Sequence, residues 1–359
     1  MKVLMFIFAI FALLGAVDCV FGSKFKIGKE FEKGIMSLGP LALSMVGMIC
    51  ISPVLAKLLL PLINPVAELC RFDSSVIIGS ILANDMGGAP LAVEIAGNEF
   101  WGYFNGLVVG GMLGVTVSFT IPVALKTVKE EYHSDVLLGI LCGICTIPVG
   151  CFISGIILGA DLIELLLNLV PVIIISALVA FGILRFPKTT VKVFSIFGKI
   201  IAAIISLGLG CGIFESLTGV VIIPGMLPIS DAFATVSGIA IVLAGVFPLI
   251  FVVSKILSKP LMIVGKVLGI SGDSVLGFIA SLANSIPVFE KSSDMDRKGR
   301  ILNFAFAVSA AFVFGDHLAF CTAFNADFAL AMIIGKLSAG ISAVAVASII
   351  CSKSSNITN

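Results

Sequence analysis

Charged side chains are scarce in this sequence: only 12% of its 359 residues are Asp, Glu, Lys or Arg. A soluble protein of this size carries about 25%. Hydrophobic residues make up 59% of the chain, and the mean hydropathy is +1.21. These values exclude a large soluble core and leave a membrane protein, with the lipid bilayer as its surroundings. The net charge of +1 gives no electrostatic basis for a nucleic-acid partner, whereas a homo-oligomer is compatible with the composition.

The motifs of enzymes and of ATP-driven pumps are missing. The sequence has no nucleophile–base constellation, phosphate-binding loop or zinc-protease motif, so we expect no enzyme and no cofactor. Its nine cysteines are scattered singly, mostly inside apolar stretches, and are expected to be small hydrophobic residues rather than disulfide partners. Cys142 and Cys145 form a Cys-x-x-Cys, but no second ligand pair accompanies them, so no metal site is predicted.

Apolar runs of about 20 residues recur along almost the whole chain, which is the length that crosses a bilayer as a helix. No alternation with a period of two residues is present, which argues against a membrane barrel. The sequence therefore predicts an all-α polytopic membrane protein. The predicted spans are 3–21, 36–60, 101–125, 134–158, 164–184, 200–218, 233–254, 301–323 and 328–350.

Two shorter apolar segments resemble each other across 200 residues. Asp73 matches Asp273, and the Ala-Asn pair that ends in Asn84 matches the pair that ends in Asn284. Each segment has about ten apolar residues, then the asparagine, then a Gly or Pro breaker. Ten helical residues reach about 15 Å, half of a hydrocarbon core. Interrupted segments in matching places of two halves are the best sequence indication of a transporter's substrate site.

The distribution of positive charge decides whether these two segments, 74–97 and 274–290, cross the membrane. If both are re-entrant hairpins, 18 of the 22 Lys and Arg residues lie on one side. If both cross, the charges divide nearly evenly. Because positive residues gather on the cytoplasmic side, we expect two re-entrant hairpins, nine full spans, an outer N-terminus and a cytoplasmic C-terminus.

The repeat predicts the domain organisation. Residues 1–158 form a first repeat of four spans and the hairpin 74–97. Residues 159–194 contain a linker transmembrane helix, and residues 195–359 form a second repeat with the hairpin 274–290. Because the linker makes the number of preceding spans odd, the second repeat enters the membrane inverted. The two hairpin tips are then expected to meet near the midplane.

The first hairpin tip carries Asn84 and Asp85. A carboxylate beside the carbonyl end of a half-helix is suited to a cation, so Asp85 is predicted to bind a positively charged substrate. Asn84 and Asn284 would bind a hydroxyl or amine, or they would only cap the half-helices. Glu94, on the return arm of the first hairpin, is a further candidate.

Asp316, His317 and Lys336 lie within predicted spans, where ionisable groups are costly and usually functional. The Asp316–His317 pair is predicted to relay a proton or to hold a substrate amine, and Asn303 precedes it in the same span. The alternative is structural: Asp316 and Lys336, on consecutive antiparallel spans, would form an internal ion pair.

Several stretches of the chain form recognisable motifs. They are Gly34-Ile-Met-Ser-Leu-Gly39, Met45-Val-Gly-Met48, Pro53-Val-Leu-Ala56, Asp85-Met-Gly-Gly88, Leu282-Ala-Asn-Ser-Ile-Pro287, Phe304-Ala-Phe-Ala-Val-Ser-Ala-Ala311, Gly315-Asp-His317 and Gly335-Lys336-Leu337. These stretches resemble the ethanolamine-utilisation transporter family, EutH. The resemblance covers nearly the entire chain, and its most specific block runs from Phe304 to Leu337.

The resemblance implies an inner-membrane protein that takes up ethanolamine for bacterial ethanolamine catabolism. It also implies that Asp85, Asn284, Asp316, His317 and Lys336 stand where similar residues stand in the family, whereas Asn84 replaces a frequent cysteine. The alternative is a Na⁺- or H⁺-coupled carrier of another small cationic or polar organic solute. An intramembrane enzyme would need two convergent catalytic groups, and a channel would show no substrate exchange.

Overall fold

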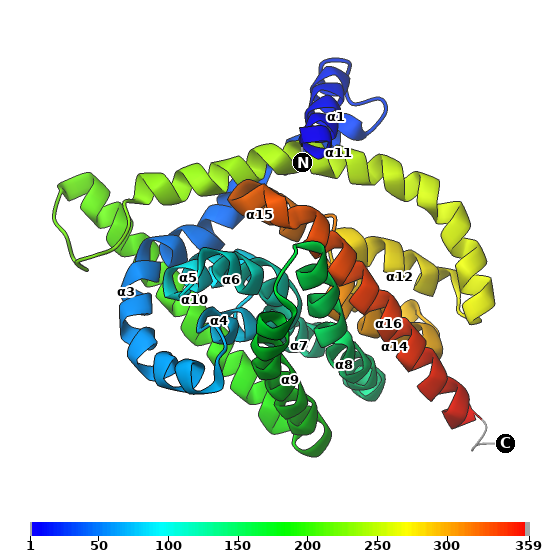
Figure 1. The fold of residues 1–359 in the computed structure, drawn as a ribbon. Coiled ribbons are helices and arrows are strands. Elements are labelled where there is room, and N and C mark those ends of the chain that lie inside the picture. The colour runs from blue at the N-terminus through cyan, green and yellow to red at the C-terminus, as the bar shows by residue number, and fades with distance from the viewer. Residues whose placement is uncertain (1, 356–359) are drawn as a thin grey trace.

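The computed structural model describes residues 2–355, without the side chains of residues 2, 257–261, 264 and 353–355. Over these residues the chain is entirely helical and forms one bundle, with α1 lying across the long α11 (Figure 1). In chain order, the elements are α1 (Lys2–Val20), α2 (Ile27–Met36), α3 (Leu38–Cys70), α4 (Ser75–Ile81), η1 (Asn84–Met86), α5 (Gly88–Ile95), α6 (Glu99–Tyr103), η2 (Phe104–Gly114), η3 (Thr116–Thr120), α7 (Ile121–Thr127), η4 (Glu130–Tyr132), α8 (His133–Ile157), α9 (Leu162–Arg185), α10 (Pro187–Thr218), α11 (Ile229–Leu268), α12 (Gly272–Ala283), α13 (Ile286–Glu290), η5 (Ser292–Asp294), α14 (Arg297–Ala310), α15 (Asp316–Asn325), η6 (Ala326–Phe328) and α16 (Ala329–Ser355).

Eight helical stretches of the described chain are long and apolar enough to cross a membrane. The prediction of an all-helical multi-pass membrane protein is therefore confirmed, and eight of the nine predicted spans correspond to these stretches. The stretches are Val3–Val20, Ile27–Cys70, Glu99–Thr127, Glu130–Ile157, Leu162–Arg185, Pro187–Thr218, Ile229–Ile256 and Asp316–Ser352.

The ninth predicted span, 301–323, is wrong as a continuous helix. It breaks between α14 and α15, and Phe312 there adopts the left-handed region with φ 62°. The backbone N–H groups of Phe312 and Phe314 donate to the carbonyls of Ser281 (2.9 Å) and Leu282 (2.8 Å) in the last turn of α12. The last carbonyls of a helix have no partner within that helix. The chain therefore exchanges hydrogen bonds of its own helix for bonds to a neighbouring one.

Each of the two predicted hairpin segments is two short helices, and its ends lie close together. Segment 74–97 consists of α4, η1 and α5, and the Gly97 N–H donates to Asp73 Oδ2 (3.1 Å). Segment 274–290 consists of α12 and the short α13. Next to it, the Ser271 N–H donates to Asp296 Oδ1 (2.8 Å). Both segments therefore return close to where they start.

Several helix pairs meet in backbone contact at a glycine, among them α3 with α10 and α11 with α1. A Cβ on Gly47 of α3 would collide with the Ile205 carbonyl of α10, and a Cβ on Gly245 of α11 would collide with the Phe8 carbonyl of α1. Small residues let membrane helices approach closely in this way. The two crossings fix α3 against α10 and α11 against α1.

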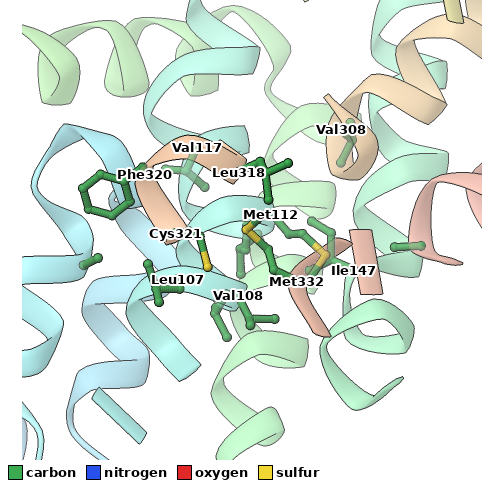
Figure 2. Packing of buried hydrophobic residues seen from close by; sticks show 14 of the residues in the cluster. Leu107, Val108, Met112, Val117, Ile147, Val308, Leu318, Phe320, Cys321 and Met332 are labelled. Atoms are coloured by element: carbon green, nitrogen blue, oxygen red, sulfur yellow. The ribbon is translucent and has the colours of Figure 1, made fainter. Parts of the chain in front are cut away.

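The π-helical η2 forms the core of the bundle, and all eleven of its residues are buried. Figure 2 shows Met112 of η2 packed among apolar side chains of α8, α15 and α16, including Ile147, Leu318 and Met332. The described cysteines are all free, and Cys321 lies within the same apolar cluster, as expected for a small hydrophobic residue.

The glycine stripe of this helix faces the first broken segment. A Cβ on Gly106 would meet the backbone of Ala89, and one on Gly114 would collide with the Leu82 carbonyl. Small residues in such a stripe allow close packing of backbones. Its packing partner is the hairpin rather than a second long helix.

Candidate functional site

The first helix break holds Asn84 and Asp85 inside the bundle. The chain becomes extended after Ile81, turns through η1 and restarts as α5 after Gly87. Gly87 has φ 86°, and a Cβ there would collide with the Met48 side chain, so glycine is required at this turn. The break leaves the carbonyl end of α4 and the Asp85 carboxylate close together.

The Asn84 side chain is fully buried, and both its amide oxygen and its amide nitrogen lack a hydrogen-bond partner. Leaving a buried polar group unpaired costs about 1–3 kcal/mol, and such a group calls for an explanation. It faces Gly111 of η2, where a Cβ would lie 3.7 Å from the Asn84 nitrogen and 3.6 Å from His317 Nδ1. An amide in this position is available to a small polar ligand.

The second break has a different asparagine geometry. Asn284 is extended, and its side-chain oxygen accepts a hydrogen bond from the Ile286 N–H (2.8 Å), which caps α13. The side chain is partly exposed and lines a cavity. Of the two alternatives for these asparagines, capping therefore applies to Asn284 and not to Asn84.

The third break, before α15, completes a cluster of charged groups. His317 Nε2 lies 4.0 Å from Asp85 Oδ1, and His317 Nδ1 lies 3.1 Å from Lys336 Nζ. Lys336 Nζ also donates a hydrogen bond to the Gly111 carbonyl. The His317 ring stacks on Phe312, with the ring centroids 5.1 Å apart. His317 and Lys336 are 1% and 0% exposed, so only Asp85, whose side chain is 23% exposed, opens to space around the cluster.

The predicted ion pair between Asp316 and Lys336 does not form. Lys336 points to η2 and His317, while the Asp316 side chain lines a cavity on the other side of the α15 start. Consecutive positions at a helix N-terminus project in different directions. Asp316 and His317 therefore face different partners.

A cavity of about 410 Å³ leads from the surface to the second and third helix breaks. Asp316 and Asn284 line it, and so do Glu30 and Lys33 of α2. Charged groups thus line this cavity both from α2 and from the first turn of α15. Its volume is many times the ~30 Å³ share of one water molecule, so it admits a small hydrated solute.

Glu94 and Asn303 are not part of this arrangement. Glu94 is exposed near the end of α5, and neither residue lines the cavity. Asn303 Nδ2 donates to the carbonyls of Ser274 (2.8 Å) and Gly299 (2.9 Å), which holds α12 against α14. Their contact with a substrate stays a prediction that neither the cavity lining nor the charged cluster supports.

Two groups at the site were not predicted from the sequence. The Gly111 carbonyl accepts a hydrogen bond from Lys336, 225 residues away in the chain. In the sequence, Lys33 of the amphipathic α2 is only one of several basic residues in the connection 22–34. No pattern in the sequence distinguishes either of them.

The fold and these groups define the class: a multi-pass membrane protein with a charged, buried cluster where broken helices meet. The model of the family described as "Ethanolamine utilisation protein, EutH" matches residues 1–350, and the chain belongs to this family.

The chain is 46% identical to the "Probable ethanolamine permease EutH" of Listeria monocytogenes, over 96% of this chain and 92% of that one. It is 41% identical to the "Uncharacterized protein YxeR" of Bacillus subtilis, over 95% and 92% of the two chains. It is 38% identical to the "Probable ethanolamine permease EutH" of Escherichia coli, over 98% and 96%. No solved structure matches the chain.

Proposed function

We propose that this protein carries ethanolamine, as its cation, across the cell membrane and so supplies bacterial ethanolamine catabolism. The observation that carries the proposal is the partly open Asp85 carboxylate beside the fully buried, unpaired Asn84 amide, inside a protein with eight apolar spans. The permease names of the Listeria and Escherichia relatives support the same substrate.

The chemistry of the substrate matches these groups. An alkyl amine is protonated at neutral pH, as lysine is with its pKa of ~10.4, and its charge prevents diffusion through hydrocarbon. Asp85 would bind the ammonium, and the Asn84 amide would bind the hydroxyl. Asn284 and Asp316 would receive the substrate from the cavity, while His317 would hold the Asp85 carboxylate in place.

We also propose that residues 1–158 and 195–359 are inverted repeats, joined by a linker that contains α9. The crossing of α3 with α10 at Gly47 has a counterpart in the crossing of α11 with α1 at Gly245. Asn105 Nδ2 binds Ser75 Oγ (2.9 Å), and Asn303 Nδ2 correspondingly binds the Ser274 carbonyl (2.8 Å). Contacts repeated at an offset near 198 residues support the same packing in both halves.

The proposed orientation places the N-terminus outside and the C-terminus in the cytoplasm. The cavity is lined by α2, which lies in the basic connection 22–34. Because basic connections stay in the cytoplasm, the cavity would open inward. The hairpins 74–97 and 274–290 would enter from opposite faces, and their neighbouring ends support the re-entrant form.

Uptake of labelled ethanolamine into liposomes that contain the purified protein tests the function. Asp85→Asn keeps the size of the side chain and removes its charge. Loss of one desolvated ion pair is expected to cost about 2–4 kcal/mol, which is a roughly thirty- to nearly thousand-fold weaker apparent affinity. Glu99→Gln, at an exposed acidic residue after the same hairpin, should behave as the wild type.

Normal uptake by Asp85→Asn at equal protein density would show that the substrate site does not lie at the first hairpin. Absence of wild-type uptake above protein-free liposomes would overturn the proposed function. Preloading the liposomes with unlabelled ethanolamine should accelerate entry of the label, because a carrier exchanges its substrate. An open channel would give no such acceleration.

A further inference from the structure

Lys336 is a lysine with no access to water: its side chain is 0% exposed, in the N-terminal third of α16. Its ammonium is held by the Gly111 carbonyl and by His317 Nδ1, and none of the ion pairs among the described side chains includes it. A buried charge is costly unless it is compensated. Burial of this lysine therefore needs a reason beyond packing.

The hydrogen bond from Lys336 fixes the protonation of His317. An ammonium has only donors, so Nδ1 must accept, and the ring hydrogen of neutral His317 must sit on Nε2. That hydrogen faces Asp85 Oδ1 at a nitrogen–oxygen distance of 4.0 Å. Lys336 Nζ, the His317 ring and the Asp85 carboxylate thus lie in sequence: a hydrogen bond joins the first two, and the last step, at 4.0 Å, is longer than a hydrogen bond.

The surroundings make the charge balance of this line strict. Met112, Leu318 and Met332 belong to the apolar core around it (Figure 2). The other titratable groups that act on the line are Asp316 of α15, which interacts with Asp85, and Cys151 of α8, which interacts with Lys336. Lys33 of α2 interacts in turn with Asp316. Lys336 is enclosed in this apolar core, Asp85 lies at its partly open edge, and the two opposite charges act on each other.

We propose that Lys336 is the internal counter-charge of Asp85, and that a proton leaves through His317 when the substrate cation binds, so that cation and proton are exchanged without net charge. This inference rests on the proposed function. A cation arriving at Asp85 would leave one uncompensated positive charge in the core. Release of one proton restores neutrality.

The step balances as a proton transfer alone. Lys336 Nζ–H gives its proton to His317 Nδ1, and the hydrogen on Nε2 passes to water beside the partly open Asp85. The products are a neutral Lys336 amine, a neutral His317 with its hydrogen on Nδ1, the substrate–Asp85 pair and one released proton. After the substrate leaves, water returns a proton to Nε2, and the Nδ1 hydrogen goes back to Lys336.

Electroneutral exchange and movement of the cation alone differ in the charge that they carry. The experiment measures labelled ethanolamine uptake at about pH 6 in liposomes with the wild type, with protein-free liposomes subtracted. It also records transport current on supported membranes. An inside-negative potential of ~100 mV should change wild-type accumulation less than twofold, whereas a carrier of one charge would gain about fifty-fold. An inside-acid gradient should raise accumulation about tenfold per pH unit, because one-for-one exchange makes the two concentration ratios equal.

Three variants and a control test the relay itself. Lys336→Met removes the exchangeable proton, so its uptake should become current-carrying and lose its response to the pH gradient. Lys336→Arg keeps a charge that cannot be released, so uptake should fall at least tenfold. His317→Gln interrupts the relay and provides a second test if Lys336→Met does not fold. Lys57→Met, at an exposed lysine of α3, should match the wild type.

A wild-type current of one charge per ethanolamine, with uptake intact, would overturn the inference and leave the proposed function standing. Electroneutral, pH-driven uptake by folded Lys336→Met or His317→Gln would also overturn it. No wild-type uptake at all would overturn both.

Discussion

At the scale of single residues, the two break asparagines have opposite roles despite their matching sequence positions. The side-chain oxygen of Asn284 accepts a hydrogen bond from the Ile286 N–H at the start of α13 and thereby caps that helix. Asn84 is fully buried and makes no hydrogen bond with either amide atom. The proposed reason for keeping a residue at such a cost is a ligand that supplies the missing bonds. Stability and binding should therefore respond in opposite ways at Asn84.

Asn84→Leu removes both unpaired atoms while keeping nearly the same shape. Replacing an unsatisfied polar group by an apolar one is neutral or stabilising, so the melting temperature in detergent should stay equal or rise. Ethanolamine affinity should fall by about 1–2 kcal/mol, or roughly five- to thirtyfold, as for the loss of one hydrogen bond.

Asn284→Ala is the contrasting variant. It loses a cap worth about 0.5–2 kcal/mol and should melt earlier. If Asn84→Leu melted earlier while binding ethanolamine normally, Asn84 would be a structural residue.

At the scale of elements, each hairpin is tied at its base by an aspartate. Asp73 accepts hydrogen bonds from the Ser75 N–H (2.9 Å) and from the Gly97 N–H (3.1 Å), which closes the first hairpin. Asp296 accepts from the Ser271 N–H, the Ser274 hydroxyl and the Gly299 N–H at 2.7–2.9 Å. It thus joins the start of α12 to the start of α14, outside the spans. Anchored bases allow the tips of the hairpins to be unwound.

Asp296→Ala should destabilise the protein by about 1–3 kcal/mol at pH 7, because a charged cap and two further hydrogen bonds are lost. Burial by itself would raise the pKa of Asp296, but the hydrogen bonds from Ser271, Ser274 and Gly299 outweigh it and hold the pKa below its ordinary value. A lowered folded-state pKa means that the stabilisation is complete above the unfolded value of ~3.9 and is lost as pH falls through the folded value.

Melting in detergent between pH 7 and pH 3 measures this dependence. The difference between wild type and Asp296→Ala should be constant above about pH 5 and should shrink below about pH 4. Asp294→Ala, at an exposed residue of the same connection, should melt like the wild type. A difference that stayed the same down to pH 3 would rule out the charge as its source.

At the scale of the whole molecule, hydropathy was enough to predict the class and eight of the spans, because burial in lipid depends on local composition. The breaks near Asn84 and Asn284 were also predictable, since Gly and Pro follow the first and Pro follows the second. The break between α14 and α15 was not, because it depends on carbonyls about thirty residues away in α12. The partner of Lys336 was misassigned for a similar reason. Its ammonium binds the Gly111 carbonyl, 225 residues away in the chain, instead of the predicted partner Asp316.

The proposed inverted arrangement is testable by labelling in intact cells. Glu99→Cys and Lys291→Cys place thiols at exposed positions just after each hairpin, in a parent whose native cysteines have been replaced. A membrane-impermeant maleimide should label position 99 from outside. It should label position 291 only after the cells are opened. The cysteine-free parent gives the background, and labelling of both positions from the same side would contradict the inversion.

The crossings at Gly47 and Gly245 have a mechanical consequence. Where two backbones touch without intervening side chains, an added atom must push the helices apart, because the contact is already close-packed. Both crossings join a helix of the first half of the chain to a helix of the second half, α3 to α10 and α1 to α11. A methyl group added at either glycine would therefore shift one half against the other, although neither glycine lies in the charged cluster.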